Sequence, residues 1–286
     1  MSVALPRPTS EGSARSLIAF FATLTTAPGA PYRWLRYMVP LIIPVAVLLL
    51  WGVASAAHWL PEQILPSPQS VASAFHDTWA SGELPTNLQM TLRWLLEGYA
   101  IGLGLGLLLG IATGLSERAE EYVYPTFKAM AYVPVLGWLP LWLVVLGVGD
   151  SLKVVLVAQA SLTPVVFNVF TGIRGVSPAL IDVGRVLRFD RAQLLRRIIL
   201  PAAFPALWSG VRFSLTKGWL ALVAIEILAS TEGLGYMMVN ARSLYQLDVM
   251  FVAVIGIGLL GYGLDRSLEA IERRVLRWRS PAEAIA

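Results

Sequence analysis

Six apolar stretches constrain this chain more than any other feature, because each is long enough to cross a bilayer as a helix of about 20 residues. The chain has 286 residues, a mean hydropathy of +0.66 and 14% charged residues. These values are typical of polytopic membrane proteins. We therefore predict an all-α fold with six transmembrane helices, at residues 37–59, 92–115, 124–148, 152–171, 203–230 and 249–271.

The composition excludes several kinds of chemistry. There is no cysteine, so disulfides and thiol catalysis are excluded. His58 and His76 are too few and too far apart to indicate a metal site. No Walker-type phosphate loop occurs, so the chain does not hydrolyse ATP by that route. The sequence contains no nucleophile and base in a pattern that would indicate an enzyme.

The arginines predict the orientation of the spans. Residues 58–92 contain no Lys or Arg, whereas arginines cluster before the first span, between the fourth and fifth spans, and after the sixth. By the positive-inside rule both termini lie in the cytoplasm. The net charge of +4 therefore reflects membrane orientation rather than a nucleic-acid partner. We predict a cytoplasmic tail at 1–36, a transmembrane domain at 37–273 and a cytoplasmic tail at 274–286.

An apolar segment at residues 16–26 is too short to span a bilayer. We interpret it as an interfacial helix on the inner leaflet, in contact with membrane lipid. A signal peptide is the alternative. Cleavage there would place Arg33 and Arg36 outside, against the charge rule.

The arginine-rich segment from Ser177 to Pro201 is predicted to form two short helices between the fourth and fifth spans. Ser177 can cap the first helix, with Pro178 at its first position. Asp190 can cap the second, and Gln193 completes a capping-box pattern. Pro201 is expected to end that helix.

Seven residues of this segment give it a spacing that resembles the EAA loop of binding-protein-dependent ABC transporter permeases: Asp182, Val183, Gly184, Arg188, Ile198, Leu200 and Pro201. The family pattern runs Glu-Ala-Ala, three residues, Gly, nine residues and Ile-x-Leu-Pro. The chain departs from it with Asp for Glu, Val-Gly for Ala-Ala, and Arg188 for the Gly. If the left-handed turn is kept, arginine costs about 1 kcal/mol there.

The resemblance implies a type I ABC importer permease in a bacterial inner membrane. Such a permease works as a homodimer with two cytoplasmic ATPase subunits and a periplasmic substrate-binding protein. It carries no cofactor of its own, because ATP and Mg are bound by the ATPase. By this resemblance, Asp182 to Gly184 and Arg188 contact the ATPase, while Ile198, Leu200 and Pro201 anchor the loop to the fifth span.

Further stretches are similar to the branch of the family that imports aliphatic sulfonates, taurine and nitrate: residues 65–68, 81–84, 210–213, 219–226 and 233–236. The expected cargo is a small oxyanion. We rank aliphatic sulfonates first, taurine second, and nitrate or bicarbonate third.

Glycines recur every four residues along the second predicted span, at Gly102, Gly106, Gly110 and Gly114. This spacing predicts a ridge on one helix face that lets a second backbone approach closely. A nucleotide-binding loop is disfavoured, because the spacing differs and no strand precedes it.

Ionisable residues inside spans are candidates for the substrate pathway. Arg212, Trp219 and Glu226 are spaced by seven and share one face of the fifth span, with Lys217 about opposite. Glu97 is placed to pair with a charge of the fifth span. For each residue, structural pairing between helices is the slightly favoured alternative to ligand contact.

Prolines interrupt the third predicted span, where Pro134 and Pro140 are expected to break the helical hydrogen bonds. The break lies either beside the pathway or at a packing kink. Outside the spans, residues 69–80 carry an amphipathic pattern that predicts a surface helix or a docking site. Gly233 and Gly235 predict a tight turn, with a hinge or gate as the alternative.

Two other function classes remain open from the sequence. A proton-coupled secondary transporter would use Glu97 and Glu226, but six spans show no evident inverted repeat. A scaffold subunit would explain the packing glycines equally well. The secondary transporter leaves the arginine-rich helical pair unexplained, and the scaffold predicts no transport defect when Asp182 or Gly184 is replaced.

Overall fold

A computed structural model describes residues 35–61 and 64–277, and the chain divides into two compact units, residues 1–68 and 69–286. In the described part every regular element is helical, which confirms the predicted all-α fold. The interfacial helix predicted at 16–26 lies outside the described residues, as does most of each predicted tail.

The first unit contains one described helix, α2 (Leu35–Ala56). It coincides over most of its length with the first predicted span, residues 37–59. The Trp51 indole nitrogen donates a 3.0 Å hydrogen bond to the Pro66 carbonyl and so ties the loop after α2 back to the helix.

The remaining elements are, in chain order, α3 (Pro68–Ala80), α4 (Glu83–Leu115), α5 (Glu117–Tyr122), α6 (Tyr124–Ala131), the 3₁₀ turn η1 (Val135–Trp138), α7 (Leu139–Leu146), α8 (Asp150–Arg174), α9 (Pro178–Val186), α10 (Arg191–Leu194), the π-helical turn η2 (Leu195–Ile199), α11 (Leu200–Ala229), α12 (Leu234–Ser243) and α13 (Leu247–Val275).

The six-span count is confirmed only in part. Among the described residues, four helical stretches are long and apolar enough to cross a membrane: α4, α8, α13 and the run from Arg191 to Ser243 that includes α11. A bent pair, Glu117–Ala131 with Val135–Leu146, raises the number to five if it forms one span.

The third predicted span is broken rather than kinked, with an angle of 88° between its two halves. Pro134 lies at the break with ψ of 138°, outside the helical range. Pro140 does not break a helix. It occupies the first turn of α7, where a proline removes no helical hydrogen bond.

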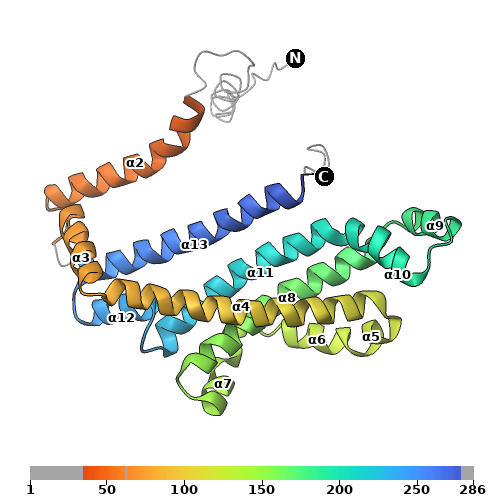
Figure 1. Ribbon diagram of the computed structural model, residues 1–286. Helices are drawn as coiled ribbons and strands as arrows, with labels where there is room; N and C mark the ends of the chain where they lie inside the picture. The colour runs from red at the N-terminus through yellow and green to blue at the C-terminus, as the bar shows by residue number, and fades with distance from the viewer. Residues whose placement is uncertain (1–34, 62–63, 278–286) are drawn as a thin grey trace, which may run out of the picture. The chain divides into compact units, whose positions relative to one another are not determined.

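The centre of the second unit is built from α4, α8 and α11, which run side by side (Figure 1). The predicted glycine ridge of α4 lies against α8. A Cβ at Gly102 would lie 2.4 Å from the Ala158 carbonyl oxygen, and one at Gly106 would lie 2.7 Å from the Val165 Cβ. Gly98 extends this ridge by one more turn. Only glycine allows the two backbones to approach so closely.

A buried aromatic centre lies where the three helices meet, at Trp94 of α4 and the aliphatic residues around it: Leu95, Val157, Leu215 and Leu222. On α3 the buried positions are Val71, Ala74 and Thr78. The stacked rings of Phe75 and Trp79, 6.0 Å apart, are half exposed beside that buried face.

Candidate functional site

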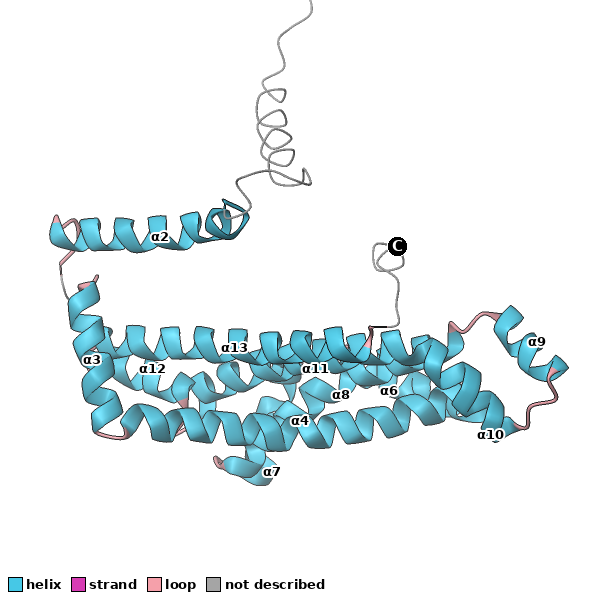
Figure 2. Cartoon of the chain, turned by 45° about the horizontal axis from the view of Figure 1, so that its top comes forward, coloured by secondary structure: helices cyan, strands magenta, loops and turns pink. Residues whose placement is uncertain are grey.

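Three places in the second unit combine unusual geometry with functional groups: the turn between α9 and α10, a pocket beside α11, and a buried junction at the start of α12. The first and third lie at opposite ends of the α4–α8–α11 bundle in both views (Figure 1, Figure 2).

The turn between α9 and α10 is held by backbone hydrogen bonds typical of a Schellman motif. The Phe189 N–H donates to the Gly184 carbonyl at 3.0 Å, and the Arg188 N–H donates to the Arg185 carbonyl at 2.9 Å. Arg188 has a φ of +52°, in the left-handed region that favours glycine. The turn expected at this position is therefore kept even though the residue is arginine.

The N-terminal ends of α9 and α10 lie where the sequence predicted them. Ser177 is the N-cap of α9 with Pro178 in its first turn, although the serine side chain makes no capping hydrogen bond. Asp190 and Gln193 form a complete capping box. The Gln193 N–H donates to Asp190 Oδ1 at 2.7 Å, and the Asp190 N–H donates to Gln193 Oε1 at 3.1 Å.

Gly184 is the contact point between α9 and the following helix. A Cβ there would lie 2.6 Å from Leu194 Cδ1 and 2.7 Å from Ile198 Cδ1. The absence of a side chain thus lets α9 fold back onto the helix that leads into α11. This explains why glycine replaces the alanine of the resembled pattern at this position.

The other face of α9 is apolar and exposed. Four residues of the helix and the turn leave large apolar side chains uncovered: Leu180, Val183, Val186 and Leu187. Val186 is 82% exposed. Asp182 pairs with Arg185 at 3.0 Å beside this face. An apolar patch rimmed by charges is typical of a protein interaction site.

Pro201 does not end the second helix of the segment, as predicted, but lies in the first turn of α11. The helical path continues from α10 through η2 into α11. In η2 the Leu200 N–H reaches back five residues to the Leu195 carbonyl. This π-type register accommodates the missing N–H of Pro201 without stopping the helix.

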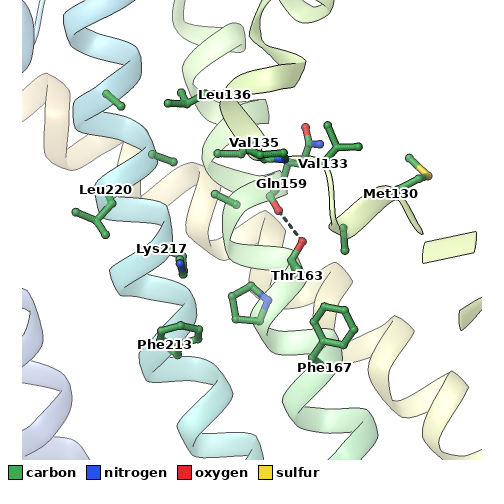
Figure 3. Close-up of a pocket in the computed structure, with 16 residues that line it drawn as sticks. Met130, Val133, Val135, Leu136, Gln159, Thr163, Phe167, Phe213, Lys217 and Leu220 are labelled. Carbon is green, nitrogen blue, oxygen red and sulfur yellow. Dashed lines mark hydrogen bonds between the residues drawn. The ribbon is translucent and has the colours of Figure 1, made fainter. Parts of the chain in front are cut away.

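The pocket has a volume of about 470 Å³ and lies between α8, α11 and residues 130–136 (Figure 3). Most of its lining is apolar, with Phe167, Phe213 and Leu220 among the larger groups. Its polar side chains come from Lys217 of α11 and from Gln159 and Thr163 of α8. None of the described residues that line it is Asp or Glu.

Lys217 differs from the other basic residues of the long central helices. Arg93, Lys153, Arg174 and Arg212 each lie beside a carboxylate. Lys217 has no ion pair within the described part of the chain, and its ammonium lies 5.3 Å from the Phe213 ring centroid. An unpaired cation in a membrane helix is expected to face a watery cavity or a ligand.

The buried junction brings together α4, α11 and the start of α12. The Glu226 carboxylate accepts hydrogen bonds from Thr91 Oγ1 at 2.7 Å and from the Gly235 N–H at 2.8 Å. Thr91 Oγ1 also accepts from the Leu234 N–H at 2.9 Å. These side chains satisfy N–H groups at the first turn of α12 that have no partner within that helix.

The two glycines of this junction are required by the carboxylate. Gly233 has a φ of +99°, and a Cβ there would lie 2.5 Å from Glu226 Oε1. A Cβ at Gly235 would lie 2.7 Å from the Glu226 Cβ. The predicted turn is present, and it also encloses a buried acid.

The residues predicted for a substrate pathway do not lie together. Lys217 and Pro134 line the pocket. Arg212 instead forms a two-point ion pair with Asp265 of α13, at 3.1 and 3.2 Å, and a second pair with Glu272. The remaining three lie elsewhere: Trp219 against Gly261 of α13, Glu226 in the buried junction, and Pro140 at the start of α7.

Glu97 does not pair with the fifth span, because its carboxylate accepts a 2.8 Å hydrogen bond from Arg93 on the same helix. Sequence reasoning also missed Gln159, whose side chain is a notable polar group in the pocket. Its only signal was an amide within an apolar helix. The acids of α13 that pair with Arg212 could not be identified from the sequence, because pairing between helices depends on which helices are neighbours.

Residues 102–277 match the protein family described as "Binding-protein-dependent transport system inner membrane component". Among curated relatives, the chain is similar to proteins named as aliphatic sulfonates transport permease SsuC. The one from Escherichia coli (strain K12) is 39% identical over 86% of this chain and 94% of the relative, and the one from Bacillus subtilis (strain 168) is 35% identical over 88% and 90%. The E. coli taurine transport system permease protein TauC is 30% identical over 88% of this chain and 94% of TauC.

Among solved structures, the fold is similar to the inward-facing MetNI methionine ABC transporter, with a TM-score of 0.52 and 22% identity over 68% of this chain and 94% of that one. It is also similar to an amino acid ABC transporter crystallised with histidines, with a TM-score of 0.55 and 20% identity over 70% and 97%. At these identities the likeness concerns the fold.

Proposed function

Since the chain belongs to the family of binding-protein-dependent transport system inner membrane components, we propose that it carries aliphatic sulfonates through the membrane in an ATP-driven importer. A member of this family is a multi-pass inner-membrane permease subunit and not itself an enzyme. The family implies a separate ATPase and a substrate-binding protein as partners.

The proposal for the cargo depends on one observation: among the described residues, Lys217 has no acid partner and the pocket that it lines has no carboxylate. A cation with apolar surroundings suits an anion that carries an alkyl group. The relatives named for aliphatic sulfonates support the same choice. Taurine is the second candidate, because of the likeness to TauC.

The proposed contact with the ATPase is the exposed face of α9 and the turn after it. We assign Asp182, Val183 and Arg188, which are exposed, to this contact, whereas Gly184 supports it from within by letting α9 pack on Leu194 and Ile198. The exposed apolar side chains of α9 support the assignment, because they have no cover within the described chain. Ile198, together with Leu200 and Pro201, would pass the motion into α11 through the continuous helix that begins at Arg191.

The proposed assembly is a homodimer of this permease with both termini in the cytoplasm. The clustering of arginines at both ends of the chain and around α9 and α10 supports this orientation. The substrate-binding protein would deliver cargo on the outer side. ATP and Mg would be bound by the ATPase, and this chain would hold no cofactor.

The proposed mechanism is alternating access without covalent chemistry. Closure of the ATPase dimer moves the two α9–α10 segments, and rigid helices carry the shift across the membrane. Because the energy source is a separate chain, the permease needs only two packing states of similar free energy.

The test is uptake of radiolabelled butanesulfonate into proteoliposomes that contain the permease, its ATPase and its binding protein. We expect uptake that requires internal ATP and survives collapse of the proton gradient. Asp182→Arg is expected to abolish uptake and ATPase co-purification while the permease stays folded, because a cation then replaces an anion beside the exposed face of α9. Glu121→Arg, exposed on α5, is the matched control.

Uptake driven by the proton gradient without ATP would contradict the proposal and favour a secondary transporter. Full uptake and ATPase binding in the Asp182→Arg variant would count against the assigned contact and favour a scaffold role for this segment.

A further inference from the structure

We propose that the pocket between α8, α11 and residues 130–136 is a binding site in the permease itself that takes alkanesulfonates and discriminates against taurine. The inference rests on the proposed function and extends it. It assigns the sulfonate group to Lys217 and Gln159 and the alkyl chain to the apolar walls (Figure 3). It assigns the discrimination to the lack of an acid among the described lining residues.

Gln159 is oriented for an anion by a tryptophan. The Trp142 indole nitrogen donates a 2.9 Å hydrogen bond to Gln159 Oε1. An indole N–H only donates, so it fixes the carbonyl end of the amide toward Trp142. The amide NH₂ is then left to donate, and it gives no hydrogen bond to a described residue. Gln159 therefore presents a donor, rather than an acceptor, for a ligand.

Lys217 supplies the charge from the facing helix. Its ammonium has three donors and no acid partner in the described part of the chain, with only the Phe213 ring 5.3 Å away. A sulfonate has three oxygens that accept hydrogen bonds. It can therefore accept from the ammonium and the amide together, and such charge-assisted bonds are stronger than neutral ones.

The rest of the lining suits an alkyl chain. Beyond Lys217, Gln159 and Thr163, the side chains are apolar, with Phe167 and Leu220 on the two long helices and Met130 on α6. The volume of about 470 Å³ lies in the range of small-molecule sites. A carbon chain would gain free energy in proportion to the apolar area that it buries.

The described residues that line the pocket include no Asp or Glu, and this gives the site its selectivity. Taurine is ethanesulfonate with an ammonium at the far carbon. On entering this pocket the taurine ammonium would lose its contact with water, and no described lining residue offers a carboxylate to pair with it. It would also lie near Lys217, which carries the same charge. An unpaired charge away from water is costly, so the zwitterion is disfavoured relative to the simple anion of the same length.

The test measures binding of radiolabelled hexanesulfonate to the permease–ATPase complex in nanodiscs, without the binding protein, whose own selectivity would otherwise dominate. Ethanesulfonate and taurine are matched competitors of equal chain length. We expect taurine to compete at least about 10-fold less well, which corresponds to about 1.4 kcal/mol. Lys217→Gln should weaken hexanesulfonate binding by a similar factor, whereas Lys217→Arg should retain it.

Lys128→Gln is the matched control, because this lysine lies on α6, is exposed and does not line the pocket. Equal competition by taurine and ethanesulfonate, or unchanged binding in the Lys217→Gln variant with intact ATPase co-purification, would overturn the inference. ATP-driven butanesulfonate uptake by the wild-type assembly separates the two proposals. If uptake is present, such a binding result overturns only the assignment of the pocket as a sulfonate site. If the wild-type assembly imports no sulfonate, the proposed function itself is wrong.

Discussion

At the scale of single residues, the turn after α9 has an arginine at a backbone position that normally favours glycine. Arg188 occupies a left-handed position that glycine would adopt without strain. The backbone hydrogen bonds of the turn are nevertheless complete. Gly184, four residues earlier, lacks a side chain where α9 packs onto Leu194 and Ile198. The turn is therefore maintained by this packing and by its backbone hydrogen bonds.

The left-handed conformation of Arg188 predicts the effect of the Arg188→Gly substitution. The substitution should stabilise the turn by up to about 1 kcal/mol, because the left-handed strain is removed. Arg185→Gly, inside α9, should instead destabilise by about 1 kcal/mol, because glycine is a poor helix former. Hydrogen exchange of the α9 and α10 amides measures both. Faster exchange in Arg188→Gly would show that the arginine side chain holds the turn by a contact of its own.

At the scale of elements, α4 and α8 pack against each other with their backbones in close approach. The glycine ridge was readable in the sequence because it repeats every four residues, but its partner helix was not. The contact at Gly102 is the tightest of the ridge, and the atom that a Cβ would meet is a backbone carbonyl, which cannot rotate away.

Gly102→Ala should therefore destabilise the protein by about 1–3 kcal/mol through overpacking. Gly104→Ala is the matched control on the same helix, because nothing lies within 4 Å of its Cβ position. It should be neutral or slightly stabilising, since alanine favours helix. Thermal unfolding of the purified permease in one detergent distinguishes the pair. Equal unfolding midpoints would show that α8 shifts freely against α4.

At the scale of the molecule, one acid joins three helices at the end of the bundle opposite α9. Both oxygens of Glu226 accept hydrogen bonds, from Thr91 on α4 and from the backbone of α12. The chain from Arg191 to Ala229 runs as one helical path between the exposed α9–α10 turn and this junction. A movement of the turn can therefore reach α12 without crossing a loop.

Glu226→Gln should loosen this junction. A glutamine has one oxygen and one NH₂ group. If its oxygen keeps the Gly235 N–H, its NH₂ faces Thr91 Oγ1, and the Thr91 hydroxyl must accept from it and give up its own hydrogen bond to residue 226. A buried donor without a partner costs about 1–3 kcal/mol. We expect a lower unfolding midpoint and faster hydrogen exchange at Leu234 and Gly235. Glu121→Gln on α5 is the exposed control. Unchanged exchange in α12 would show that another contact holds it.

Reading along the chain was enough to predict the helical class, most span positions, the N-cap positions of α9 and α10, the glycine ridge and the family. These follow from hydropathy and from spacing within one helix, and both act over a few residues. Which cations are paired became clear only from the packing of the helices. Arg212 meets acids of α13, and Glu226 meets α4 and α12, whereas Lys217 meets no acid within the described chain. Burial and pairing depend on which helices are neighbours, and no local spacing encodes that neighbourhood.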